Sequence, residues 1–241
     1  MEKKYAETAE LRVVHCDMHG DWRPAAILEA MQETAGAHCA RLGIGRDVTD
    51  ALGVAWVLSR TRVELARTPR LNETVTVETW PLPTKHLFYP RANRFLDGEG
   101  REIGGATSLW VLMDVKTRRM VASDAVAARL PDNGDMPFGP GMPATVRPQP
   151  GLRRALTPAY TDFDVNGHVN NARYMDWCCA ALGFDAFEGA RLARFDVNYE
   201  GEILPGAQVE TELALGEGSF TFCGSGGGRR LFAVSGTLAA R

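Results

Sequence analysis

FDVNGHVNNARYMDWCCAALG, residues 163–183, is a polar turn followed by an apolar segment that ends in Leu-Gly. CDMHG, residues 16–20, has the same form, with an Asp three residues before a Gly, and it also precedes an apolar segment ending in Leu-Gly. Asp, Asn and Gly favour turns, and a Gly just after a helix suits its C-terminal cap. The chain therefore contains two copies of one turn-and-helix unit.

Both apolar segments are predicted to be helices. Residues 23–42 place Ile27 and Met31 at helical spacing, and Pro24 suits a first turn. The second helix is expected at residues 170–182, and from Tyr174 onward it is apolar on nearly every side, which predicts burial on most of its faces.

Runs with the alternation of half-buried antiparallel strands follow each helix. The copies also match beyond the helices, because VELARTPRLNETV (63–75) aligns with VNYEGEILPGAQV (197–209) without a gap. One long helix on a curved antiparallel sheet, made twice, predicts an α+β fold of the tandem (double) hotdog type. The predicted strands are 56–65, 74–80, 88–96, 104–114, 191–199, 207–215, 219–223 and 231–238.

A Pro- and Gly-rich stretch divides the two copies. Residues 131–151 are typical of a fairly stiff connector without regular structure. We therefore expect an N-terminal domain at 1–130 and a C-terminal domain at 152–241.

Composition excludes several classes of protein. A formal net charge of -3 over 241 residues argues against a general nucleic-acid binder. Five cysteines without a CxxC pair indicate neither a disulfide framework nor a zinc site, and we expect no metal and no cofactor. An N-terminus without an apolar signal region, and no run long enough to cross a bilayer, predict a cytoplasmic protein without a membrane span.

The two copies differ in their polar residues, so the fold itself does not require the polar cluster of the second copy. That cluster is a candidate catalytic site. The second copy has Asp164, Asn166, His168 and Glu202, and the first copy has His19, Asp21 and Thr68 at the last three of these places.

These residue types suit attack on an activated carbonyl. A carboxylate such as Glu202 that bonds one imidazole nitrogen of His168 leaves the other nitrogen free to accept a proton. Alternate side chains in an extended turn point the same way, so Asp164 and Asn166 could converge on His168. We expect the amides near Val169 and Asn170 to be unpaired and able to hold an oxyanion. The alternative is that these are ordinary turn and cap residues, as we interpret Asp162, Asn170 and Asn171.

Other polar stretches favour structural explanations. HCDMH (15–19) contains metal-ligand residue types but mirrors the second turn, and GSGGGRR (224–230) fits a hairpin turn. Cys178 and Cys179 lie in the second, apolar helix, where core packing is expected. His38 lies on the apolar stripe of the first helix and is expected to pack in the core or line a pocket, and His86 is expected in an exposed loop.

DFDVNGHVNNARYMDW (162–177) closely resembles the D-x-N-x-H-V-N-N-x-x-Y-x-x-W signature of the fatty acyl-ACP thioesterases of plants and bacteria. The resemblance covers nearly the whole chain and includes the first helix and the strands after it. It implies a tandem hotdog fold with an acyl-chain pocket in the N-terminal half. It also implies that the catalytic residues lie in the C-terminal half, at Asp164, Asn166 and His168.

A second family motif, YEGEI (199–203), places its Glu at Glu202. Many plant members have a Cys where this chain has Ile203, so a thiol nucleophile cannot act from that position. The resemblance implies that Glu202 polarises His168 for proton transfer and that Asn166 orients Asp164 or the substrate. Asp164 then either activates water or attacks the thioester itself, and both routes remain open.

The expected activity is hydrolysis of fatty acyl-ACP to a free fatty acid and ACP, which ends or diverts fatty acid synthesis. The alternatives are an acyl-CoA thioesterase of the same superfamily and a non-catalytic acyl-binding protein. A hotdog dehydratase is disfavoured because NGHVNN lacks the His-Pro motif typical of those enzymes.

The expected partner is an acyl carrier protein, and a homodimer is possible. Such carriers are acidic, so recognition predicts clustered basic residues. The candidates are Arg153, Arg154, Arg173, Arg191 and Arg194, with Lys116, Arg118 and Arg119 as a second group.

Overall fold

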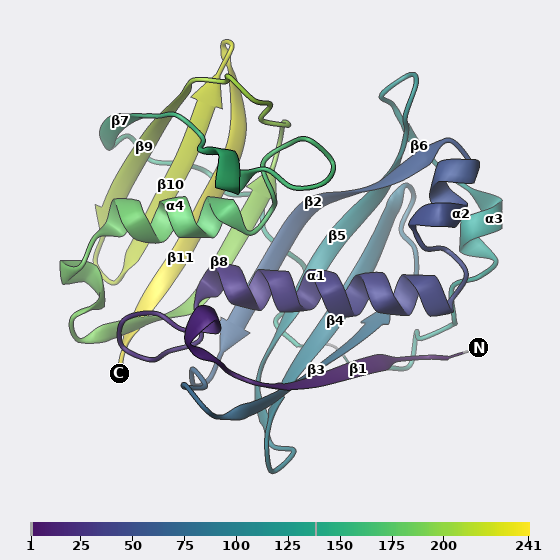
Figure 1. Cartoon of the computed structure of the whole chain (residues 1–241), viewed down its shortest axis with the longest axis horizontal. Helices are drawn as coiled ribbons and strands as arrows, with labels where there is room; N and C mark the ends of the chain where they lie inside the picture. The colour runs from purple at the N-terminus through teal and green to yellow at the C-terminus, as the bar shows by residue number, and fades with distance from the viewer. Residues whose placement is uncertain (1, 138) are drawn as a thin grey trace.

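Each half of the chain supplies one long helix and five strands to a shared sheet, and the first half adds an eleventh strand of two residues, in the computed structural model, which describes residues 2–137 and 139–241 (Figure 1). The first half contains β1 (Tyr5–Glu10), α1 (Pro24–Arg41), β2 (Val54–Leu65), β3 (Thr74–Pro81), β4 (Phe88–Asp97) and β5 (Glu102–Asp114). The second half contains β7 (Leu152–Leu156), α4 (Arg173–Leu182), β8 (Ala190–Tyr199), β9 (Val209–Gly216), β10 (Ser219–Gly226) and β11 (Arg229–Ala240). The shorter elements are η1 (Val13–His15), α2 (Arg46–Ala51), β6 (Met120–Val121), α3 (Asp124–Ala127), η2 (Tyr160–Asp162) and η3 (Asp185–Phe187).

The strand order is β1-β3-β4-β5-β2-β8-β11-β10-β9-β7, with every pairing antiparallel and β6 added beside β5. β1 and β7 are the edges, and β2 meets β8 at the centre, so the order of each half mirrors that of the other. In the alignment of 63–75 with 197–209, Arg62 is the counterpart of Asp196, and these two residues pair directly across β2 and β8. The internal repeat seen in the sequence therefore recurs in the strand order and in the central register.

Both long helices form where the sequence predicts them, but the second begins three residues later than expected. Asn170 Oδ1 accepts a hydrogen bond from the Ala172 N–H at 2.9 Å, and the Arg173 N–H donates to the Asn170 carbonyl at 3.0 Å. The Asn170 side chain thus holds a tight turn in place of a first helical turn. At the other end, Gly183 follows α4 with φ of 78°, as expected of a C-terminal cap.

The eight predicted strands are confirmed, whereas the two edge strands, β1 and β7, were not predicted. Their residues are mostly exposed, with burial patterns that lack an apolar face. Short polar edge strands show little of the alternation that identifies a strand in sequence, because neither of their faces is buried.

Figure 1 shows α1 and α4 lying on one face of the sheet. Ile27 and Met31 of α1 and Met175 and Cys178 of α4 belong to one buried cluster that also contains inner-face residues of both halves, among them Phe195. The shared cluster makes the two halves parts of one hydrophobic core.

The connecting segment, residues 131–151, has no helix or strand in its described part and crosses the face of the sheet opposite the helices. The Ala144 N–H donates to Asp196 Oδ1 at 3.0 Å, and the Val146 N–H donates to Asn198 Oδ1 at 2.8 Å. Arg62 Nε donates to the same Asp196 oxygen at 2.9 Å, and the two side chains are only 12% and 4% exposed. One buried carboxylate thus ties together the two central strands and the connecting segment.

Replacing Asp196 with Ala would leave the Arg62 guanidinium buried without its partner. We expect a loss of about 3 kcal/mol in the free energy of unfolding, measured by urea denaturation. The control is Asp50→Ala, which breaks the Arg46–Asp50 pair at 3.7 Å between side chains that are each 65% exposed, and should cost less than about 0.5 kcal/mol. Equal effects of the two substitutions would contradict a structural role for the central pair.

Candidate functional site

A tight turn before α4 carries the three polar residues of the predicted signature. The Asn166 N–H donates to Asp164 Oδ1 at 2.8 Å, the Gly167 N–H donates to the Asp164 carbonyl at 3.0 Å, and the Asp164 N–H donates to the His168 carbonyl at 3.1 Å. Gly167 has φ of 77°, a conformation that favours glycine. The backbone, rather than the side chain, of Asn166 contacts Asp164, and the Asn166 side chain is exposed.

His168 and Asp164 are brought together on this turn. His168 Nδ1 lies 3.9 Å from Asp164 Oδ1, and their side chains are 29% and 17% exposed. The same nitrogen lies 3.4 Å from the Val169 carbonyl oxygen, so Nδ1 carries the proton when it bonds there. Nε2 has no hydrogen-bond partner within the described chain, and in this tautomer it carries the free lone pair of the ring.

Glu202 forms an ion pair with Arg118, which lies in the turn between β5 and β6. No hydrogen bond joins Glu202 to His168 among the residues that the structure describes. The sequence indicates Arg118 only as a candidate basic residue, because no local pattern links two residues that lie 84 positions apart.

Tyr174 is a buried tyrosine of α4 near both Glu202 and Asp164. Burial raises the pKa of its hydroxyl, and the charges of Glu202 and Asp164 raise that pKa further, so both carboxylates lie within electrostatic reach of the ring. The ring of Tyr174 packs edge-on against the ring of Tyr199 at 5.4 Å, and the Tyr199 hydroxyl donates to the Asn171 carbonyl at 3.1 Å.

The prediction that the amides of Val169 and Asn170 are unpaired was wrong. The Val169 N–H donates to the Ile203 carbonyl at 3.0 Å, and the Asn170 N–H donates to the Asp162 carbonyl at 2.9 Å. Both amides hold the turn against neighbouring chain. The next amide, that of Asn171, has no acceptor within the described residues.

A small pocket lies between α1 and the first-half sheet and reaches Asn171 and Tyr199 of the second half. Its lining joins apolar side chains to several polar ones. The residues around it are Leu28, Met31, Gln32, Ala35, Leu58, Thr61, Arg91, Asn93, Ser108, Trp110, Asn171 and Tyr199. The pocket therefore reaches Asn171, which closely follows the turn with Asp164 and His168.

The first copy has the same turn geometry, but the residue at the place of His168 is held in ion pairs. The His19 N–H donates to Asp17 Oδ1 at 2.8 Å, as Asn166 does to Asp164. Asp21, the counterpart of His168, pairs with Arg70 at 3.5 Å and with Arg241 at 3.0 Å.

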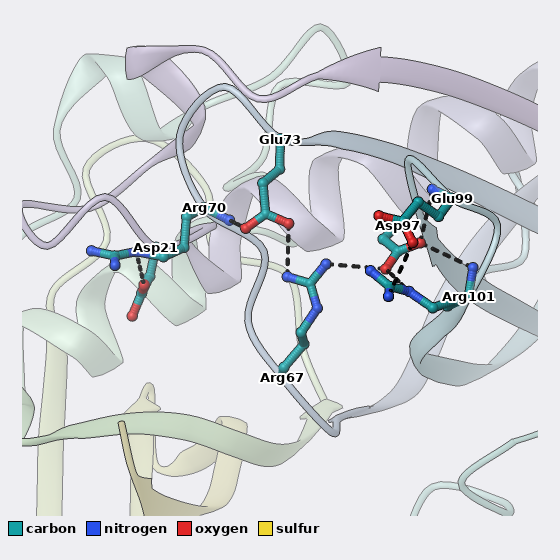
Figure 2. A network of polar contacts seen from close by, with 7 residues as sticks. All are labelled: Asp21, Arg67, Arg70, Glu73, Asp97, Glu99 and Arg101. Carbon is teal, nitrogen blue, oxygen red and sulfur yellow. Dashed lines mark hydrogen bonds and ion pairs between the residues drawn. The ribbon is translucent and has the colours of Figure 1, made fainter.

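Figure 2 shows that Asp21 is one end of a longer polar network. Arg67 bridges Glu73 at 2.7 Å and Asp97 at 3.4 Å, and Arg101 reaches Asp97 at 2.9 Å. Burial opposes ionisation of Asp97, but hydrogen bonds from the Arg101 and Glu99 N–H groups and from the two guanidiniums hold its pKa at about 2. The first copy thus uses its polar residues to brace loops.

His38, His86 and the glycine-rich stretch 224–230 have the structural roles that the sequence predicts. His38 is fully buried, with Nε2 3.2 Å from the Glu2 carbonyl oxygen, and burial followed by the nearby Arg91 charge lowers its pKa to about 4. His86 is exposed, and the turn between β10 and β11 is a glycine hairpin. No group of three potential ligands positioned to hold a metal ion occurs in the described residues, and no helix among them is long and apolar enough to span a bilayer.

The cysteines near the site are poor nucleophiles. Burial raises the pKa of Cys178 well above its usual range, and burial with the charges of Asp176 and Asp17 raises that of Cys179 to about 12. Ile203 is buried in the core, as its side chain is 1% exposed. A thiolate is the reactive form of cysteine, so neither thiol is activated here.

Comparison with protein-family models identifies both halves. Residues 2–128 match the acyl-ACP thioesterase N-terminal domain, and residues 147–223 match the acyl-ACP thioesterase C-terminal domain. Among curated proteins, an acyl-[acyl-carrier-protein] hydrolase of Cuphea viscosissima is 27% identical over 213 residues, which are 78% of this chain and 49% of the relative. A dodecanoyl-[acyl-carrier-protein] hydrolase of Cinnamomum camphora is 26% identical over 223 residues, which are 80% of this chain and 55% of the relative.

Solved structures share the fold over its whole length. An acyl-ACP thioesterase from Bacteroides thetaiotaomicron superposes with a TM-score of 0.91 at 24% identity, covering 98% of both chains. The 12:0-ACP thioesterase from Umbellularia californica gives a TM-score of 0.86 at 23% identity, covering 100% of this chain and 99% of that one.

At neutral pH, iodoacetamide should modify neither Cys178 nor Cys179 in the folded protein, because Cys178 is buried and the raised pKa of each group, Cys179 included, keeps it a protonated thiol. Peptide mass spectrometry of samples treated with and without urea measures this, and both residues should be modified in urea. Rapid modification of either cysteine in the folded protein would restore a thiol mechanism to consideration.

Proposed function

Because the chain belongs to the acyl-ACP thioesterase family, we propose that it hydrolyses the thioester between a fatty acyl group and acyl carrier protein. The chain spans about half the length of the curated relatives that it matches. The observation that carries the proposal is the Asp164–His168 pair, 3.9 Å apart on an open turn beside a pocket under α1. The first copy of the turn has no such pair, because its Asp21 is bound in ion pairs.

In the proposed mechanism, water attacks the thioester carbonyl carbon while His168 Nε2 takes its proton. The tetrahedral intermediate collapses with breakage of the C–S bond, and the imidazolium returns the proton to the departing thiolate. The Asp164 carboxylate stabilises the imidazolium. This role suits Asp164 better than direct attack, because the Asn166 N–H already holds Oδ1 and the Asn170 amide lies 3.4 Å from Oδ2.

The unpaired N–H of Asn171 is the proposed oxyanion donor, because it lies on the turn and its residue lines the pocket. Glu202 is assigned an indirect part. Its pair with Arg118 tethers the β5–β6 turn beside the site, and its charge acts on Tyr174 together with that of Asp164. Direct polarisation of His168 by Glu202 stays a prediction.

We also propose that the α+β fold is a tandem of two hotdog units. The N-terminal unit, 1–130, supplies the acyl pocket, 131–151 is the linker, and 152–241 carries the catalytic turn. The mirrored strand order and the Arg62–Asp196 register support this division. A cytoplasmic location and a homodimer stay predictions.

The acyl carrier protein is proposed to dock at the β5–β6 turn. Lys116, Arg118 and Arg119 are exposed there, and the Arg118–Glu202 pair joins that turn to the site. The other candidate group is less suited to docking, because Arg153 is paired with Glu210 and Glu212, each at 3.3 Å.

His168→Ala and Asp164→Asn should each lower kcat/KM on acyl-ACP by at least about 100-fold, because they remove the proposed base and its partner. Thiol release from purified acyl-ACP measures turnover, and circular dichroism measures folding. The matched control, Asp17→Asn, changes the same position of the first turn and should leave turnover close to that of the parent protein.

Equal losses at Asp17 and Asp164 would remove the assignment of the site to the second half. Full activity of the His168 variant would overturn the mechanism. Binding of acyl chains without any turnover by the parent protein would identify an acyl-binding protein instead.

Reversing two charges, as Lys116→Glu with Arg119→Glu, should raise KM for acyl-ACP and leave KM unchanged for a short acyl thioester of cysteamine, which carries no protein. Rim charges mainly speed encounter, so kcat/KM of the parent protein should also fall as salt rises. The control pair, Arg153→Glu with Arg154→Glu, should have a smaller effect. Insensitivity to both salt and reversal, with acyl-CoA cleaved equally well, would favour the acyl-CoA thioesterase.

A further inference from the structure

The floor of the pocket under α1 is a row of polar side chains. Thr61 of β2 pairs in register with Ser108 of β5, and Ser108 pairs with Arg91 of β4, so the three lie side by side across the sheet. Asn93 lies two residues beyond Arg91 on the same face, and all four line the pocket. An alkyl chain in this pocket would meet polar atoms at its floor.

Two of these polar atoms are buried without a partner. Thr61 Oγ1 and Asn93 Oδ1 make no hydrogen bond within the described chain, and the two residues are 1% and 2% exposed. Arg91 is buried as well, and its guanidinium donates to Thr79 Oγ1 at 3.2 Å and to Cys39 Sγ at 3.4 Å, with His38 Nδ1 at 3.2 Å. Covering such atoms with a purely apolar chain would leave them without water or a partner.

The second half shows that the fold does not require this polarity. Thr61 corresponds to Phe195 in the internal repeat, and Phe195 pairs with Gly236 as Thr61 pairs with Ser108. Gly236 pairs in turn with Phe220, and Phe222 lies two residues further along β10. The places of Thr61, Arg91 and Asn93 are therefore taken by the phenylalanines 195, 220 and 222, all of them buried in the shared apolar core.

We propose that the pocket selects an acyl chain that carries a hydroxyl group, which is held at the polar floor. A hydroxyl both donates and accepts, so it can donate to Asn93 Oδ1 and accept from Thr61 Oγ1 or the Arg91 guanidinium. The hydrocarbon part of the chain lies against the apolar lining of α1, where Leu28, Met31 and Ala35 face the pocket. This inference rests on the proposed function and names the substrate class of the same site.

The test compares acyl-ACPs of one chain length that differ only at one carbon. The parent protein is assayed on the alkyl chain and on a series that carries a hydroxyl at each successive position, with oxo and terminal carboxyl chains as further arms. We expect kcat/KM for one hydroxyl position to exceed that of the alkyl chain by at least about tenfold, because buried polar groups discriminate against a chain that leaves them unpaired.

Variants identify the atoms responsible. Thr61→Val and Asn93→Leu should each bring the hydroxyl-to-alkyl ratio of kcat/KM towards one. Thr107→Val is the matched control, because Thr107 is equally buried and its Oγ1 also lacks a partner in the described chain, but it occupies the opposite face of β5. The ratio should be unchanged in that variant.

Hydrolysis of alkyl chains without a hydroxyl preference at any position would overturn this inference and leave the proposed function standing. A stronger preference for the oxo or carboxyl chains would also overturn it, as would a hydroxyl preference that survives both Thr61→Val and Asn93→Leu. Absence of turnover on every acyl-ACP would instead overturn the proposed function itself.

Discussion

The buried pair of Arg62 and Asp196 is the constraint on which the rest of the molecule depends. It lies where β2 meets β8, so it holds the two halves of the sheet in one register, and the same carboxylate accepts the Ala144 N–H of the connecting segment. A buried charge pair of this kind tolerates little displacement, because each charge depends on the other for its solvation. The relative position of the two halves follows from this junction.

That position gives the proposed site its two parts. The reactive turn belongs to the second half, whereas the pocket lies under the helix of the first, and they meet at Asn171 and Tyr199. Tyr174 packs against Tyr199, and its pKa is raised by burial and then by the charges of Glu202 and Asp164. Neither half contains the whole arrangement.

Duplication followed by divergence explains this division. Both copies keep the turn, with Asp17 and Asp164 capping it in the same way. The first copy then uses its polar residues in the network of Figure 2 and leaves a pocket under its helix, while the second leaves its turn open and fills the corresponding space with aromatic rings. Under the proposed function, the first copy would supply the acyl pocket and the second copy the catalytic turn.

The sequence by itself determined the repeat, the two helices, eight strands and the turn with Asp164 and His168, because each depends on local periodicity or on turn-forming residues. Only the tertiary structure decided that Arg118 pairs with Glu202. It also decided that the Val169 and Asn170 N–H groups donate hydrogen bonds to backbone carbonyls. The shared pocket of Thr61 and Asn93 is a third such feature. These facts depend on strands that are far apart in the chain and on which side chains become buried. No local pattern encodes them, because they exist only once the sheet has closed around its core.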